Sequence, residues 1–394
     1  MENFEQIKII LNSIKILVYA AKDNKISGDK LKDVQMASNE INEIFYHSEK
    51  LKFQKEHLLQ SKEDIEEYVK EMEKIIEIWE LTISRRNGKR VDIAFWKIYE
   101  MFLYVDTEQI FQMVLQKFNA LPEEWKIEYL SLPHRYSFLT AKIDYTKNDY
   151  SLIEQYVNVL AEHVEDYRWL YEHLADFRSK EILNGIIRYW LDFDINRLYK
   201  LLETIFSNYY DSDIWQGNSD SVFVDLGAYI GDSVLDYIET FGSFKKIYAY
   251  EITPSTYEIL CKNTKAFENV IPLCKGVSDK EKIMYINGTS GGAGNKISED
   301  GDTAVEVVTL DDDIQEPVSV IKMDIEGEEK AALVGAKRHI KNEKPILLIS
   351  AYHLPEDIFE IPKLIYQIRD DYRFYIRFNG HGCLWPCDYV LFAV

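Results

Sequence analysis

After Asp220, short runs of β-branched residues alternate with segments of helical period. This alternation is typical of a mostly parallel sheet with helices on its faces. The seven predicted strands are residues 222–226, 247–251, 270–273, 318–323, 345–351, 373–377 and 389–394. The predicted helices between them are residues 232–240, 255–265, 328–340 and 357–369. Because no helix separates the last two strands, we expect them to form an antiparallel hairpin at the sheet edge.

The first 200 or so residues contain little glycine and repeat apolar residues every three or four positions, which predicts helices. Residues 58–83 form the clearest amphipathic pattern, near heptad spacing, and both packing within one chain and a homodimer seam remain open. The other predicted helices are residues 94–118, one opened by Pro122, 151–163, 167–186 and 195–209. We therefore predict a helical N-terminal domain for substrate, partner or oligomer contacts (1–160), a helical lead-in (161–218) and an α/β domain (219–394).

The net charge of −21 disfavours nucleic-acid partners, because such a field repels phosphate backbones. The basic cluster at residues 85–90 is more typical of a solvated loop than of a binding surface. No apolar run approaches the roughly 20 residues that span a bilayer. Four cysteines in 394 residues fit a reducing compartment, and the N-terminus lacks a signal-peptide pattern. We expect a soluble, cytoplasmic protein.

The strongest motif is a strand ending in Asp225, a turn with Gly227 and Gly231, and a helix from Asp232. Glycines let a ligand approach the backbone, and the crevice at such a strand end suits nucleotide-like ligands. The dinucleotide pattern G-x-G-x-x-G lacks its middle glycine here, which favours S-adenosylmethionine. Asp225 would face the methionyl ammonium, directly or through water. The residues assigned to this part of the cofactor site are Asp225, Gly227, Ala228, Tyr229, Gly231 and Asp232.

Two further segments, together with Asp324, complete the predicted cofactor site. Glu251 ends the next strand, where an acid accepts hydrogen bonds from ribose hydroxyls, and Ile252 follows it. NAD enzymes also have an acid at this position, so Glu251 alone does not distinguish NAD from S-adenosylmethionine. Val277 and Ser278 follow the third strand, where they would enclose adenine. The same residues are also common in ordinary turns.

Asp324 and Glu326 follow the strand of residues 318–323 and share one side by the period of two. They can hold an acceptor hydroxyl, orient it, or bind a divalent cation, and two acids alone do not establish a metal site, so we predict none. His353 follows the next strand, across the crevice from Asp225. Its position makes it the favoured general base, with a structural histidine as the alternative.

Two weaker patterns lie elsewhere. The glycine-dense residues 287–294 suit either a lid or a plain connection. His381, Cys383 and Cys387 lie close in sequence, but their spacing is a poor zinc signature, so packing is the safer interpretation.

Residues 225–231, 248–251, 321–329 and 345–353 together resemble the FkbM family of methyltransferases, over roughly residues 166–394. The resemblance implies a Rossmann-like class I methyltransferase domain that uses S-adenosylmethionine and methylates hydroxyl oxygens of sugars or natural products. Asp324, Glu326 and His353 would then line the reaction centre. Residues 376–387 depart from the family pattern, and the first 150 or so residues lie outside it.

The predicted function is therefore methyl transfer to a hydroxyl of a small molecule or glycan, with methylation of an amine as an alternative. A non-catalytic scaffold that keeps a relic fold is an alternative of another class. The glycine spacing argues against an NAD-dependent dehydrogenase.

Overall fold

The computed structural model describes residues 7, 10–15, 28–49, 61–70, 72–73, 90–136, 138–286, 303–379 and 386–394. Residues 1–113 and 114–394 form two compact units. The functional boundaries near residues 160 and 218 stay predictions. The glycine-dense residues 287–294, the basic residues 85–89, and His381 and Cys383 lie outside the described residues.

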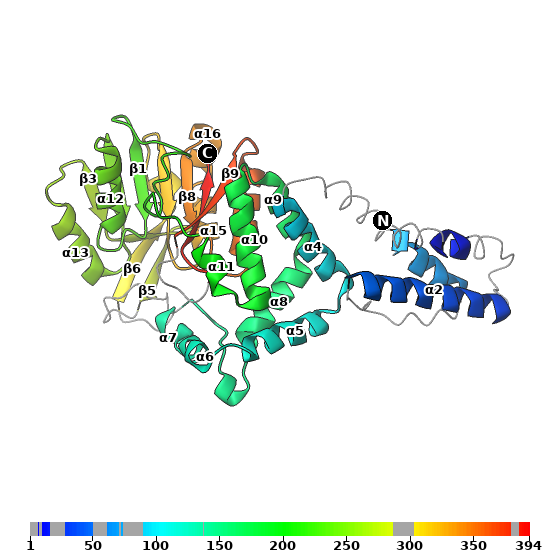
Figure 1. The fold of residues 1–394 in the computed structure, drawn as a ribbon. Coiled ribbons are helices and arrows are strands. Elements are labelled where there is room, and N and C mark those ends of the chain that lie inside the picture. Colours follow the sequence, from blue (N-terminus) through cyan, green and yellow to red (C-terminus); the bar gives the residue numbers. More distant parts are fainter. Residues whose placement is uncertain are drawn as a thin grey trace. The chain divides into compact units, whose positions relative to one another are not determined.

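The described part of the N-terminal unit is helical. It includes α2 (Gly28–Glu49) and α4 (Arg90–Tyr104) (Figure 1). Of the predicted helix 58–83, the structure describes helical residues 62–70 and 72–73. The single helix predicted over residues 94–118 is wrong, because α4 ends at Tyr104 and α5 spans Thr107–Asn119. Asp106 lies between them, and its carboxylate accepts the backbone N–H of Glu108, which starts a new helix.

Short helices and turns lead from residue 114 to the sheet. They are α6 (Glu123–Leu130), α7 (Leu132–Arg135), η1 (Tyr145–Lys147), α8 (Ser151–Glu162), α9 (Val164–His173), α10 (Phe177–Asp192) and α11 (Ile195–Tyr199). Pro122 precedes α6 as predicted. Among the described residues no helix is long and apolar enough to cross a bilayer.

Two predicted helices in this region are wrong because tertiary contacts interrupt them. The segment 167–186 breaks between α9 and α10, where the N–H of Ala175 donates to Phe374 O at 2.8 Å. Asp176 then accepts the N–H of Ser179 and caps α10. The segment 195–209 is helical only over α11, after which the N–H of Glu203 donates to Phe378 O at 2.7 Å. The chain thus leaves the helix to contact the sheet edge.

The main sheet has the order β3-β2-β1-β7-β8-β10-β9. Its strands are β1 (Val222–Leu226), β2 (Lys246–Tyr250), β3 (Val270–Leu273), β7 (Val320–Met323), β8 (Ile346–Ser350), β9 (Phe374–Phe378) and β10 (Tyr389–Ala393). The first five run parallel, and β10 is antiparallel to both β8 and β9. The predicted seven-stranded, mostly parallel sheet and its edge hairpin are confirmed. The order reverses between β1 and β7, where such sheets bind ligands.

Helices connect these strands on both sides of the sheet. They are α12 (Asp232–Phe241), α13 (Pro254–Thr264), α14 (Leu310–Asp313), α15 (Glu329–Gly335), α16 (Lys337–Glu343) and α17 (Asp357–Ile368). The single helix predicted over 328–340 is wrong, since α15 and α16 are separate. Asp311 accepts the backbone N–H groups of Arg338 and His339 and so begins α16 independently.

A second, three-stranded sheet escaped the sequence analysis. It has the order β4-β6-β5, with β4 (Lys275–Val277), β5 (Lys282–Ile286) and β6 (Thr303–Val308). β4 is only three residues long, and β5 pairs with β6 across a long intervening segment. Neither feature leaves a clear periodic signal. This small sheet places Val277 and Ser278 beside the carboxyl end of β2.

An aromatic cluster fixes residues 209–215 to the sheet and α12. The hydroxyl of Tyr210 donates to the carbonyl of Ser233, and the indole N–H of Trp215 donates to Tyr209 O at 3.0 Å. The Phe223 and Tyr237 rings stack at 4.8 Å beside them. Because these aromatic rings are buried, the segment holds Tyr209 in a defined position at the crevice.

Candidate functional site

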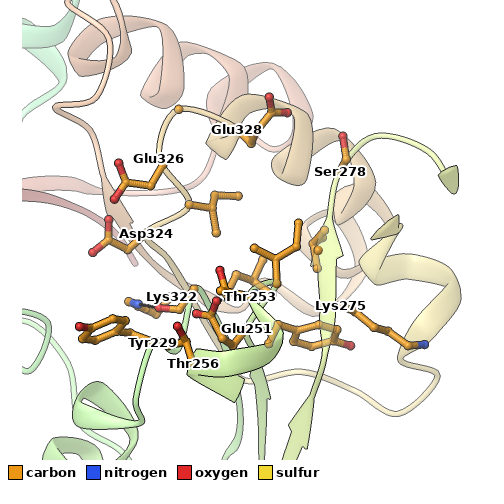
Figure 2. A pocket seen from close by; sticks show the side chains of 18 of the residues that line it. Tyr229, Glu251, Thr253, Thr256, Lys275, Ser278, Lys322, Asp324, Glu326 and Glu328 are labelled. Atoms are coloured by element: carbon orange, nitrogen blue, oxygen red, sulfur yellow. Dashed lines mark hydrogen bonds between the residues drawn. The ribbon is translucent and has the colours of Figure 1, made fainter. Parts of the chain in front are cut away.

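A cavity of about 570 Å³ opens at the carboxyl ends of β1, β2 and β7. This volume lies within the range of small-molecule sites. Figure 2 shows Glu251 and Thr256 along one side of it and Asp324 and Glu326 along the other. The predicted site residues that line it are Gly227, Tyr229, Asp232, Glu251, Ile252, Val277, Ser278, Asp324 and Glu326. Four predicted residues lie behind the residues that line the cavity: Asp225, Ala228, Gly231 and His353.

The turn after β1 packs tightly against the turn after β7. Gly227 has φ +79°, and a Cβ there would lie 2.0 Å from Asp324 O. The N–H groups of Gly227 and Ala228 both donate to Tyr250 O, at 3.0 and 2.8 Å. Glycine is therefore required at position 227 by the packing of the wall, whatever the ligand.

Asp225 is fully buried and supports this turn from behind. Lys322 Nζ lies 3.0 Å from Asp225 Oδ1 and donates to Gly227 O at 2.7 Å. The hydroxyl of Ser233, which lines the cavity, also donates to Asp225. Burial raises the pKa of the Asp225 carboxyl, and the Lys322 ammonium opposes that rise. Asp225 can therefore reach a ligand only through its neighbours, Ser233 among them.

Glu251 presents a carboxylate at the end of β2. It is 8% exposed, and its carboxylate accepts the backbone N–H of Thr253 at 2.7 Å. Burial raises the pKa of this carboxyl. A buried carboxylate beside a cavity is suited to accept hydrogen bonds from a ligand, unlike an acid that is solvated at a strand end.

Asp324 follows β7 and is held from both sides. Its Oδ2 accepts the hydroxyl of Tyr209 at 2.9 Å, and its Oδ1 lies 3.4 Å from His353 Nε2. Desolvation acts against the charged form, but the contact with His353 and the Lys322 ammonium hold the pKa of Asp324 well below its usual value. The group is thus a permanent carboxylate at the cavity surface.

Glu326 and Gly327 turn the chain away from the sheet, with φ +59° and +103°. Figure 2 shows Glu326 near Asp324, and Glu328 further along the same edge. These carboxylates make this edge of the cavity acidic.

His353 has a fully buried side chain and lies behind Asp324. Its Nδ1 is 2.9 Å from Glu329 Oε1, and the Phe138 ring meets the imidazole edge-on at 5.0 Å. Burial alone would lower the pKa of His353, but the carboxylates of Glu329 and Asp324 raise it well above its usual value. A raised pKa makes His353 less suited to accept a proton, and the buried ring faces the cavity only through Asp324.

Sequence comparison agrees with this geometry. Residues 225–376 match the family model described as the methyltransferase FkbM domain. We call this matched region the FkbM domain. No curated protein is significantly similar in sequence to this chain.

A solved methyltransferase structure shares the fold of the FkbM domain. The crystal structure of methyltransferase FkbM from Methylobacillus flagellatus KT has a TM-score of 0.53 at 24% identity, covering 61% of this chain. This chain spans 62% of the length of that protein. An rRNA methylase from Streptococcus thermophilus has a TM-score of 0.32 at 14% identity, covering 48% of this chain and 98% of its own.

Side chains that precede the FkbM match also line the cavity. They are Phe138 and Thr140, between α7 and η1, and Asn208 and Tyr209, in the segment before β1. The sequence analysis missed them, because no motif marks an aromatic or polar residue that reaches a site from a distant turn. It also passed over Glu329, although its position five residues after Asp324, at a helix start, was a usable signal.

Proposed function

We propose that the FkbM domain is an S-adenosylmethionine-dependent methyltransferase that methylates a hydroxyl of a sugar, a glycan or a related metabolite. The observation that carries the proposal is the pairing of the close turn at Gly227 with the buried Glu251 carboxylate on one cavity. The two features suit a nucleoside-like ligand without a pyrophosphate.

The residues present fit this cofactor. Glu251 would accept hydrogen bonds from the ribose hydroxyls, and the turn at Gly227 and Tyr229 would face the methionyl part. Ile252, Val277 and Ser278 would enclose adenine. Asp225 would contribute through Ser233, to which it is hydrogen-bonded. When bound, the cofactor supplies an electrophilic methyl group.

Asp324 would receive the hydroxyl of the acceptor. Its carboxylate lies at the cavity surface with both oxygens fixed by neighbours, so it can orient an O–H group. A weakly basic carboxylate suffices, because a hydroxyl oxygen that gains a methyl group becomes strongly acidic. Its proton then passes to Asp324 and on to water. Glu326, on the same edge, would hold a further hydroxyl.

The acidic edge also supports a second candidate, an amine acceptor. An ammonium group would pair with Asp324, Glu326 and Glu328, whereas phosphate or carboxylate groups would be repelled there. An amine must lose its proton before transfer, so this reaction should accelerate with rising pH.

Transfer of a labelled methyl group tests the proposal. The wild-type protein with methyl-labelled S-adenosylmethionine should label a neutral glycan or polyol panel, and Asp324→Asn should label it much more slowly. Label in amine acceptors alone would establish the second candidate. Glu258→Gln, on the exposed face of α13, is the matched control and should behave as wild type.

We also propose the remaining assignments on the sequence evidence. The free thiols at Cys261, Cys274 and Cys387 fit a reducing cytoplasm. The helical residues 1–160 would select the acceptor or a partner, or join two copies of the chain.

A further inference from the structure

A line of buried groups leads away from Asp324 into the protein. We propose that Glu329 and His353 are positioning residues: Glu329 orients the His353 ring, and the ring in turn fixes the Asp324 carboxylate toward the acceptor. This inference deepens the proposed function and rests on it for the identity of the acceptor group.

The first contact in the line fixes Glu329. This residue begins α15 and has no exposed surface. Its Oε1 accepts the backbone N–H of Ile325 at 2.9 Å and lies 2.9 Å from His353 Nδ1. The carboxylate therefore ties the turn after β7 to the end of β8.

The second contact fixes Asp324. His353 Nε2 lies 3.4 Å from Oδ1, while the Tyr209 hydroxyl donates to Oδ2 at 2.9 Å. Tyr209 is itself 3.1 Å from the Ser350 hydroxyl, so it is held in place as well. With the Tyr209 hydroxyl at one oxygen and the His353 ring at the other, the rotation of the carboxylate is restricted.

The charged surroundings favour a proton on each ring nitrogen of His353, because the Glu329 and Asp324 carboxylates raise its pKa. The carboxylates facing His353 are those of Glu329, from α15, and Asp324, directly after β7. Asp357, from α17, lies near Glu329, and burial raises its pKa to about 6. The nearby ammonium groups already have partners: Lys322 pairs with Asp225, and Lys330 pairs with Asp357 and Glu360. The Phe138 and Tyr352 rings cover the imidazole.

A metal ion is the competing explanation. Ligand atoms of Asp324, Glu329 and His353 lie within 4.8 Å of one another. However, the two carboxylates face opposite nitrogens of the ring, Glu329 at Nδ1 and Asp324 at Nε2. An ion bound at one nitrogen would leave the carboxylate that faces the other nitrogen without that ion, whereas an N–H group on each nitrogen would serve both carboxylates.

Nitrogen NMR of the full chain labelled with ¹⁵N-histidine tests the proposal. The chain has eight histidines, and the signal absent from His353→Gln assigns His353. We expect wild-type His353 to show two protonated nitrogens at neutral pH. In Glu329→Gln, which keeps size and shape, its pKa should fall by about one to three, the effect of removing one opposite charge.

A second buried histidine supplies the matched control. His339 Nδ1 lies 2.7 Å from Glu343 Oε2, away from the cavity. Glu343→Gln should leave the His353 signal unchanged. If Glu329→Gln does not fold, Asp324→Asn makes the same test from the other nitrogen. A neutral wild-type His353 at pH 7, an unchanged pKa in Glu329→Gln, or selective broadening of its signal by Mn²⁺ would overturn the proposal.

Binding and methyl-transfer assays test the functional role separately from the NMR experiment. Glu329→Gln should bind S-adenosylmethionine within about twofold of wild type and transfer methyl groups about 10- to 100-fold more slowly, as for lost supporting contacts in other sites. A merely structural role would lower both together. If wild type binds no S-adenosylmethionine while the His353 signals behave as expected, the proposed function fails and the positioning contacts stand.

Discussion

The buried ion pair between Lys322 and Asp225 determines whether the cavity wall can form. Lys322 Nζ lies 3.0 Å from Asp225 Oδ1, and the two side chains are 3% and 0% exposed. Lys322→Met removes the ammonium and leaves a carboxylate buried without a counter-charge. Breaking a buried pair from one side costs about 3–5 kcal/mol. We expect the free energy of unfolding to fall by that amount.

The loss should depend on pH in a defined direction. Burial raises the pKa of Asp225, and without Lys322 nothing of comparable strength opposes that rise. A folded acid with a raised pKa binds more protons than the unfolded chain, so stability falls as pH rises above the unfolded value. The deficit of Lys322→Met should therefore be largest near pH 8 and shrink near pH 5.

Urea titration measures the free energy of unfolding of four proteins. They are wild type, Lys322→Met, Asp225→Asn and the double variant Lys322→Met/Asp225→Asn. The double variant should be more stable than Lys322→Met, because no uncompensated charge remains. Lys245→Met is the control, since Lys245 is 55% exposed and its pairing with Glu316 is worth at most about 1 kcal/mol. A Lys322→Met protein within about 1 kcal/mol of wild type, or a double variant no better than it, would refute the reasoning.

Three further predictions concern the contacts around the site. Gly227→Ala should unfold at lower temperature and lose cofactor affinity in calorimetry, since its Cβ would lie 2.0 Å from Asp324 O; unchanged melting contradicts this. Arg377→Met should cost about 3–5 kcal/mol in urea titration, because it leaves Asp211 buried without its partner at 2.6 Å; a loss below about 1 kcal/mol contradicts this. Tyr209→Phe should keep cofactor affinity but slow methyl transfer, because Asp324 loses one donor; equal losses of both would contradict it.

The strands of the main sheet were predictable because burial leaves a continuous apolar run. β1 and β3 have the predicted bounds, and β10 differs by one residue. Buried parallel strands have nearly continuous apolar sequences, because both of their faces are covered. The helix breaks were not predictable, since Ala175 and Glu203 leave their helices to donate backbone hydrogen bonds to β9. Such contacts override local helical propensity.

The candidate site was predictable in position but not in orientation. Strand order places Asp225, Glu251, Asp324 and His353 near one crevice, as the sequence indicated. Which of them opens into the cavity depends on packing: Asp225 and His353 turn inward to charged partners, whereas Glu251 and Asp324 line the surface. A sequence shows that a strand ends in an acid, and it does not show what lies across from that acid.

Calorimetric titration with S-adenosylmethionine tests the central claim most directly, with wild type, Glu251→Ala and the control Glu258→Ala in parallel. We predict micromolar binding to wild type and the control. Loss of hydrogen bonds to a charged group, about 1.5–3 kcal/mol, should weaken Glu251→Ala by about 10- to 150-fold. Absence of binding to a folded wild-type protein, or equal affinity in Glu251→Ala, would contradict the assignment of this cavity to the cofactor.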